Sequence, residues 1–388
     1  MATRVGAFFQ FLTRFRAGGS LFALAAGLPL AFLARPAAAE SIGLVMTSFH
    51  LGGEFTADGK KECPHGLNPD NRDNFRAQYK TLEEQKEVIL RLGSPDMHYR
   101  GPNGESDVYS PEAVKDLLPF YDGVASGSPG LNLDGTQDGQ ATDKTCKHTK
   151  FQNEAGDAVD NQLFRVFGCV KALRPQGMYD SFITMEIPQL LANRWLIEIS
   201  GVDDRVNDSH VDVMIAHGLD EIVSDGNGGF VAGRSQRVDE RAASYIQHTT
   251  GRIVNGVLET EPMPELRITG SGIVDIGERR FSDARFHLKL TTTGATGFVA
   301  AYHDVQRFYR FHAKTLGLHG SSAMVSMPSI YASLLRNADG HKDPATGQCT
   351  SISGVYTMDF VNANIVRQSS SKAEVAEAIS KGAAKTRQ

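Results

Sequence analysis

Residues 251–260, GRIVNGVLET, contain the clearest fold signal in the chain. Asn255-Gly256 separates two β-prone segments, and a two-residue connection of this type favours a tight hairpin because both of its residues accept positive φ. Other β-prone runs lie at 195–200, 211–216 and 284–290. Many short strands at such spacing predict a mainly β fold, with a β-sandwich or jelly-roll-like core and a few peripheral helices.

The helices expected beside this core have recognisable local signals. Thr81-Leu-Glu-Glu84 is a capping box, and Pro111 stands at a first helical position, where no N–H is needed. From residue 301 onward, apolar residues recur on one face of a helix. The predicted helices cover residues 81–92, 111–121, 301–316 and 328–337.

The predicted helix over 301–316 carries two histidines and a basic stripe. His303 and His312 are nine residues apart, which places them on opposite sides of a helix, where they cannot share a metal ion. We interpret His312, on the apolar face, as a core histidine. Arg307, Arg310 and Lys314 are interpreted as a solvated face, with an anion-binding patch as the alternative.

The first 39 residues predict a cleavable signal peptide. Residues 1–19 contain three arginines and no acid, residues 20–33 form an uncharged apolar run, and Ala37-Ala38-Ala39 offers small side chains to a signal peptidase. The alternative is an uncleaved anchor, but the apolar run is short for a membrane span. Cleavage after Ala39 would make this an exported protein, periplasmic or extracellular.

Composition predicts one large exported domain. Removing residues 1–39 deletes four arginines, so 36 basic and 45 acidic residues remain and the net charge is −9. This acidic balance weighs against nucleic acid and anionic lipid as partners. We expect a single β-rich domain over 40–367, with a mixed N-terminal part at 40–125, an acidic loop at 126–160 and a mobile tail at 368–388.

Four cysteines, Cys63, Cys146, Cys169 and Cys349, all lie in the exported part. An even count in an oxidising compartment predicts two disulfides. Zinc binding is the alternative, although the spacings contain no C-x-x-C. The pairing that we favour is Cys146–Cys169 with Cys63–Cys349, because the first pair would bracket the polar loop and help to order it.

The acidic loop contains the predicted metal site. Asn132, Asp134, Asp138 and Asp143 supply oxygen ligands around a glycine that permits a sharp turn, which suits Ca²⁺. The run D-G-x-x-D followed by Asp and Cys partially resembles a thrombospondin type 3 calcium repeat. It differs from that repeat in the asparagine at 132, in the wider spacing from Asp138 to Asp143, and in occurring once. The alternative is a solvated acidic turn without metal.

Several segments carry a wider resemblance: ECPHGLNP (62–69), LDGTQDG (133–139), DNQLFRVFGC (160–169), EISGVDDRVND (198–208) and DPATGQCTSIS (343–353). They resemble segments of exported, uncharacterised β-rich bacterial proteins, and the resemblance implies no activity. The sequence contains no G-x-S-x-G, H-E-x-x-H or Walker A motif.

The sequence therefore predicts a disulfide-bonded, calcium-stabilised binding or structural protein with an unknown ligand. A carbohydrate or a cell-envelope polymer is the expected partner. The alternative function is an extracytoplasmic hydrolase or lyase that acts on a polysaccharide, for which the sequence locates no catalytic residue.

Overall fold

The computed structural model describes residues 39–68, 80–84, 86, 101–114, 120–124, 127–190, 193–271, 276–313 and 326–367. The chain divides into two compact units, residues 1–37 and 38–388, and every described residue belongs to the second. The predicted signal peptide up to residue 38, the predicted tail, and Lys314 lie outside the described residues.

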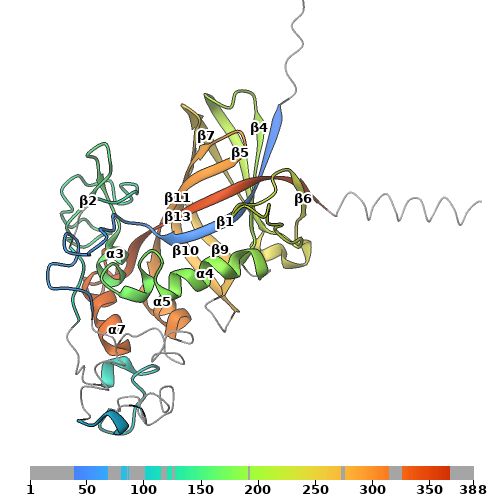
Figure 1. The fold of residues 1–388 in the computed structure, drawn as a ribbon. Helices are drawn as coiled ribbons and strands as arrows, with labels where there is room; N and C mark the ends of the chain where they lie inside the picture. Colours follow the sequence, from blue (N-terminus) through green and yellow to red (C-terminus); the bar gives the residue numbers. More distant parts are fainter. Residues whose placement is uncertain are drawn as a thin grey trace, which may run out of the picture. The chain divides into compact units, whose positions relative to one another are not determined.

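The main sheet closes into an eight-stranded antiparallel barrel (Figure 1). Its strands, in order around the barrel, are β1 (Glu40–Leu51), β4 (Trp195–Val202), β5 (Asp208–His217), β7 (Gln247–Val254), β8 (Val257–Thr260), β10 (Ile276–Leu290), β11 (Gly294–Asp304) and β13 (Cys349–Val366). β1 pairs with β4 on one side and with β13 on the other, which closes the ring.

The expectation of a mainly β core with a few helices is confirmed, but the strand arrangement differs from the expected sandwich or jelly roll. In those folds two open sheets pack face to face, whereas here the first and last strands of the domain pair from Leu44↔Asn362 to Leu51↔Tyr356. Barrels and sandwiches have the same pattern of short strands and turns, so that pattern could not distinguish them.

The remaining strands extend this barrel at its edges. β9 (Met263–Ser271) pairs with the first part of β10, and β12 (Gly340–Lys342) pairs with β13. β6 (Arg234–Arg237) runs parallel to the end of β13, and β2 (Phe151–Gln152) with β3 (Ala158–Val159) forms a separate pair.

The hairpin predicted at Asn255-Gly256 is confirmed. Val254 of β7 pairs with Val257 of β8, and the two turn residues have φ of 53° and 77°.

The described α-helices are α3 (Gln162–Phe167), α4 (Met178–Gln189), α5 (Val305–His312) and α7 (Met327–Arg336), and Figure 1 shows them on the lower side of the barrel. The short 3₁₀ helices are η2 (Pro111–Ala113), η3 (Lys171–Leu173) and η5 (Glu240–Tyr245). The predicted helix over 328–337 is confirmed as α7, whereas α3 and α4 were not predicted.

The prediction that a helix begins at residue 301 is wrong, because residues 301–304 belong to β11. The helix begins four residues later, where the Asp304 carboxylate accepts a hydrogen bond from the Arg307 N–H at 2.8 Å. The predicted capping box is present, since Thr81 Oγ1 accepts from the Glu84 N–H at 3.3 Å. The helix expected to follow it is described only in part.

Aromatic side chains cross the barrel near the end that the helices cover. Phe49 packs against Trp195 with ring centroids 5.4 Å apart, and Trp195 packs edge-on against Phe281 at 6.1 Å. Phe281 in turn lies 4.9 Å from the His303 ring. Trp195 and Phe281 are 2% and 0% exposed, so each contributes burial of order 1.5–3 kcal/mol to the core.

Both predicted disulfides are present, but the favoured pairing is wrong. Cys63 joins Cys169 and Cys146 joins Cys349. The acidic loop does not need a disulfide between its two ends, because it lies against the β12 region. There the Cys146 N–H donates to the Asp339 carbonyl oxygen at 2.9 Å. That contact brings Cys146 beside the start of β13 rather than beside Cys169.

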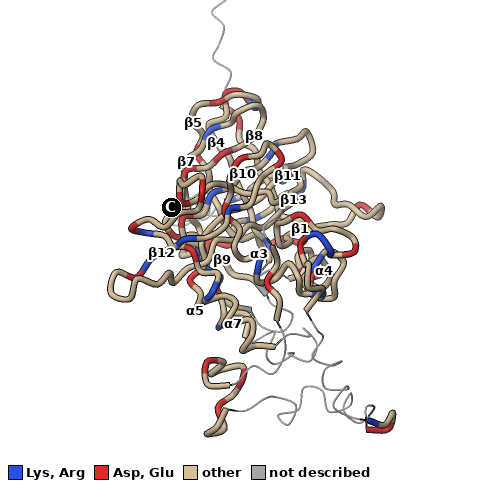
Figure 2. The backbone as a smooth tube through the Cα atoms, turned by 90° about the vertical axis from the view of Figure 1, so that its left-hand side faces the viewer, with Lys and Arg blue, Asp and Glu red and all other residues tan. Residues whose placement is uncertain are grey.

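None of the helices in the described ranges is long and apolar enough to cross a membrane. Lys and Arg positions are interspersed with Asp and Glu along the described backbone in Figure 2.

Candidate functional site

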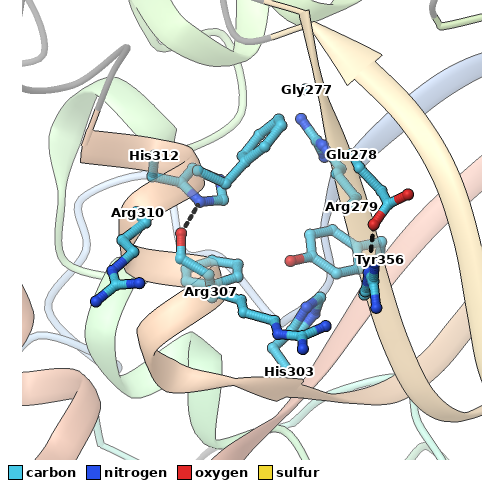
Figure 3. Close-up of a pocket in the computed structure, with 11 residues that line it drawn as sticks. Gly277, Glu278, Arg279, His303, Arg307, Arg310, His312 and Tyr356 are labelled. Carbon is cyan, nitrogen blue, oxygen red and sulfur yellow. Dashed lines mark hydrogen bonds and ion pairs between the residues drawn. The ribbon is translucent and has the colours of Figure 1, made fainter.

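A cavity of about 330 Å³ opens at the barrel end where α5 meets β10 and β11. Its lining includes Arg279, His303, Arg307, Phe311, His312 and Tyr356. Figure 3 shows Arg279, His312 and Tyr356 around one central space, with Arg307 along its lower rim and the Arg310 guanidinium turned away from the centre. An eight-stranded barrel has room inside either for packed side chains or for one small ligand.

Arg279 is the arginine of this lining that packs against two aromatic rings. Its guanidinium carbon lies 5.5 Å from the Phe49 ring centroid and 4.9 Å from that of Phe311. Residues two apart on a strand share a face, so Arg279 projects on the same side of β10 as the fully buried Phe281. These two cation–π contacts hold the guanidinium in place between the rings.

The two cavity histidines are neutral. Burial lowers the pKa of His303 to about 3, helped by the nearby His312 and Arg279. Burial and then Arg279 lower the pKa of His312 to about 3 as well. His312 Nδ1 lies 2.9 Å from the Phe308 carbonyl oxygen, to which it donates.

These two histidines correct the sequence interpretation. They were expected on opposite faces of one helix, but His303 is on β11, so both side chains line the same cavity. The phenols around them also stay uncharged, because burial raises the pKa of Tyr356 and raises that of Tyr179 to about 12.

The fixed charges of the cavity are mostly positive. Glu278 is the carboxylate of the lining, and it lies 2.7 Å from the Arg267 guanidinium and also pairs with Arg280. Burial alone would raise its pKa, but these two ion pairs lower it, so Glu278 is ionised and already neutralised. Arg307 and Arg310 are exposed. The cavity therefore favours anions.

A smaller cavity, about 50 Å³, adjoins the first and shares Arg279, His312 and Tyr356 with it. In its wall the His50 Nδ1 lies 2.6 Å from the Asp180 Oδ1, and this hydrogen bond raises the pKa of His50. The buried Tyr179 hydroxyl, also in this wall, has no hydrogen-bond partner among the described residues.

The four residues of the predicted calcium site are only partly brought together. Asn132 Oδ1 and Asp134 Oδ1 lie 3.2 and 2.5 Å from the Lys150 Nζ. Asp138 and Asp143 are exposed, and the Asp138 carboxylate accepts from the Gln140 N–H at 3.1 Å. An ammonium group therefore lies between the two predicted ligands that do meet.

Asp134 belongs instead to a buried cluster that sequence reasoning did not identify. We call its members, Asp134, His148, Lys150, Asp160 and Asp339, the buried cluster; their side chains are 0–7% exposed. The signal for two of them is present in the sequence as Cys-x-His-x-Lys, because alternate residues of an extended chain share a face. Asp160 and Asp339 come from distant segments, so no spacing connects them.

The fold and the cavity define a closed antiparallel barrel with a cationic, aromatic-lined chamber at one end. Comparisons with protein-family models, with curated proteins and with solved structures found no match for this chain.

Proposed function

We propose that this is an exported binding protein that takes a small anionic molecule with an apolar or aromatic part into the barrel-end cavity. The observation that carries the proposal is the position of Arg279, whose guanidinium lies between Phe49 and Phe311 and borders both cavities. Export is supported by the two disulfides, which persist in oxidising compartments.

Size and polarity both support a ligand of this class. A cavity of about 330 Å³ is at the small end of the range for small-molecule sites, which is roughly 300–1,000 Å³. The rings of Phe311 and Tyr356 offer apolar contact, the neutral histidines offer hydrogen bonds, and Arg307 adds charge at the rim. An acidic sugar unit of a cell-envelope polymer has the required charge, so the expected carbohydrate partner remains part of the proposal.

Two dyes that share a ring system test the role of charge. Anilinonaphthalene sulfonate is anionic, and N-phenylnaphthylamine is its neutral counterpart. The chain has one tryptophan, Trp195, which lines a small cavity together with Phe49 and Arg279, so its fluorescence reports binding at this end of the barrel. We expect the sulfonate to bind more tightly than the amine and to quench Trp195.

A matched pair of variants locates the binding. Arg279→Met keeps the aliphatic packing of the side chain and removes its charge, and should weaken sulfonate binding about tenfold, since a charge-assisted hydrogen bond contributes about 1.5–3 kcal/mol. Arg234→Met, in the exposed β6, removes the same charge far along β13 and should leave binding unchanged. Equal binding of the two dyes, or equal loss in both variants, would refute the proposal.

The alternative is the predicted polysaccharide hydrolase or lyase, and one observation favours the lyase. His50, which is hydrogen-bonded to Asp180, shares the small cavity with Tyr179 and Arg279. A histidine or tyrosine in this position can act as a general base and acid on a bound sugar, and the arginine can hold the carboxylate of that sugar. A hydrolase needs two carboxylates across a bond, and Glu278 is the one carboxylate of the larger lining. The test is ultraviolet absorbance of unsaturated sugar products from acidic polysaccharides. No product would exclude this alternative.

Calcium at Asn132, Asp134, Asp138 and Asp143 stays a prediction. It requires the exposed Asp138 and Asp143 to turn toward Asp134 and the Lys150 ammonium to move away. Thermal unfolding in EDTA and in excess Ca²⁺ tests it, since an ion that binds only the native state raises its stability. Asp138→Asn should abolish the calcium-dependent shift.

A further inference from the structure

The buried cluster lies against the outer wall of the barrel, beside the Cys146–Cys349 disulfide. Its four possible metal-ligating atoms come from separate segments. His148 Nε2 lies 2.8 Å from Asp160 Oδ1, 3.7 Å from Asp134 Oδ2 and 4.0 Å from Asp339 Oδ2. Two ligands bound tetrahedrally to one ion at 2.0–2.2 Å lie about 3.4 Å apart. The observed separations lie on both sides of that value.

Each of these side chains is held by a hydrogen bond on the atom that faces away from the others. His148 Nδ1 lies 2.9 Å from the Cys146 carbonyl oxygen and donates to it, which leaves Nε2 directed at the carboxylates. Asp160 Oδ2 accepts the Leu133 N–H at 2.8 Å. This support of the ligands by outer hydrogen bonds is typical of metal sites, where it fixes the imidazole tautomer and ring orientation.

Asp339 supplies an independent indication that a ligand belongs here. It is fully buried, and its Oδ1 accepts the Ser353 N–H at 2.7 Å. Its Oδ2 faces His148 and has no hydrogen-bond partner among the described residues. The buried Tyr302 hydroxyl is likewise without a described partner. Buried polar atoms are almost always satisfied by a partner, water or ion.

Three carboxylates surround the Lys150 ammonium and the His148 imidazole. Burial raises the pKa of Asp339 to about 7. Burial alone would lower the pKa of His148, but the Asp160 hydrogen bond and the Asp339 charge outweigh it and raise that pKa. A dication that binds here would therefore displace protons from these two groups. Lys150 contacts Asp134 Oδ1 at 2.5 Å, whereas the Asp134 atom that faces His148 is Oδ2. The ammonium also contacts Asp160 Oδ1, the atom nearest His148, at 2.6 Å, so a bound ion would displace the ammonium from Asp160. Lys150 also borders a surface cavity of about 500 Å³, which gives an ion a route from solvent.

We propose that the buried cluster binds one divalent transition-metal ion, Zn²⁺ or Mn²⁺, through one imidazole and three carboxylates. The ligand atoms of Asp134, His148 and Asp160 lie within 4.8 Å of one another. Asp339, whose Oδ2 lies 4.0 Å from His148 Nε2, becomes the fourth ligand by moving toward the ion, and Lys150 is the neighbouring counter-charge. The imidazole favours a transition metal over Ca²⁺ or Mg²⁺, which prefer oxygen ligands alone. The ion would fix the acidic loop to the barrel wall, and the site is independent of the barrel-end cavity.

Titration calorimetry of the chelator-treated full chain with Zn²⁺, Mn²⁺, Ca²⁺ and Mg²⁺ tests the proposal. We expect one transition-metal ion per chain in the wild type and about tenfold weaker binding in Asp339→Asn. Lys150→Met should bind the ion more tightly, because it removes a competing cation. His341→Gln is the matched control, since His341 also faces a carboxylate, Asp283, at 3.2 Å but at an exposed position, and it should bind like the wild type.

Thermal unfolding keeps the test decisive if Asp339→Asn does not fold. Without metal, Lys150→Met should melt below the wild type because its carboxylates lose their counter-charge, and Zn²⁺ or Mn²⁺ should restore its melting temperature. If neither ion restores it, the cluster is an ion-pair network and the proposal is wrong. Binding of Ca²⁺ alone, unaffected by His148→Gln, would also overturn it and would favour the calcium prediction instead.

Discussion

Protonation of His303 should make the protein sensitive to mild acid. His303 is 4% exposed and is enclosed by the rings of Phe281, Phe308 and Tyr356, with centroids 4.9, 4.9 and 5.5 Å away. Its pKa is about 3 in the folded protein and about 6.5 in an unfolded chain. The unfolded state therefore takes up a proton in a pH range where the folded state does not.

The sign and size of the effect follow from this difference. Because the folded pKa is depressed, the stability due to neutral His303 is fully present above about pH 6.5 and is lost as pH falls toward 3. Between about pH 7.5 and pH 5, the loss from this one residue is about 2 kcal/mol, at 1.36 kcal/mol per pH unit below the unfolded pKa.

Urea unfolding at both pH values, for the wild type and His303→Gln, measures this contribution. Glutamine keeps an N–H donor but does not titrate, so the variant should be less stable at neutral pH yet lose about 2 kcal/mol less than the wild type on acidification. His210→Gln is the control, because the His210 side chain is 69% exposed. If His303→Gln keeps the full wild-type pH dependence, His303 is not a buried neutral imidazole and the cavity is more hydrated than we infer.

Three further changes test the fold by urea unfolding. Gly256→Ala should lower the stability by about 1–2 kcal/mol, because Gly256 has φ of 77° with open space around it; an unchanged midpoint would argue against the turn. Phe281→Ala should cost about 3–5 kcal/mol, and a loss under about 1 kcal/mol would mean that the barrel interior repacks. Replacing Cys63 and Cys169 together by serine should cost about 2–5 kcal/mol, since their bridge spans 106 residues; full stability in that variant would contradict the pairing.

Local signals in the sequence predicted local structure. Asn255-Gly256 forms its hairpin, Thr81 and Glu84 form their capping box, and Pro328 lies at the start of α7. Each of these features depends on residues within a few positions of one another, so a short stretch of sequence is enough to predict it. Residues 40–367 were also correctly expected to be mainly β and to pair all four cysteines.

Long-range features could not be predicted in this way. The closing pair Leu44↔Asn362 joins residues more than 300 positions apart. Neither segment contains a local signal that identifies the strand with which it pairs. The same holds for Cys146 and Cys349. The helix start was misplaced because Ala301 lies four residues before Val305 and so fits the same helix face, yet residues 301–304 belong to a strand between β10 and β13.

The candidate sites also depend on the pairing of strands that are distant in the sequence. Arg279 and Arg280 are adjacent, and a strand directs successive side chains to opposite faces, so the sequence alone does not indicate which arginine enters the barrel. Arg280 pairs with Glu265 and Glu278, whereas Arg279 packs between Phe49 and Phe311. Arg307 and Arg310 of the predicted basic stripe are exposed on α5, but the cavity beside them is visible only in the fold.

One strand separates the two proposed sites. On β11, Tyr302 lies on the outer face, where burial and then the charges of Asp339, Asp160 and Asp134 raise its pKa. His303 lies on the inner face beside Arg279. Successive residues of one strand therefore contact an acidic cluster and a cationic cavity. The β-sheet between them keeps opposite charges from neutralising each other, because side chains of one face do not reach the other. The closed β-sheet of the barrel thus allows a cation site on its outer face and an anion site on its inner face. Variants of one proposed site should therefore leave ligand binding at the other unchanged.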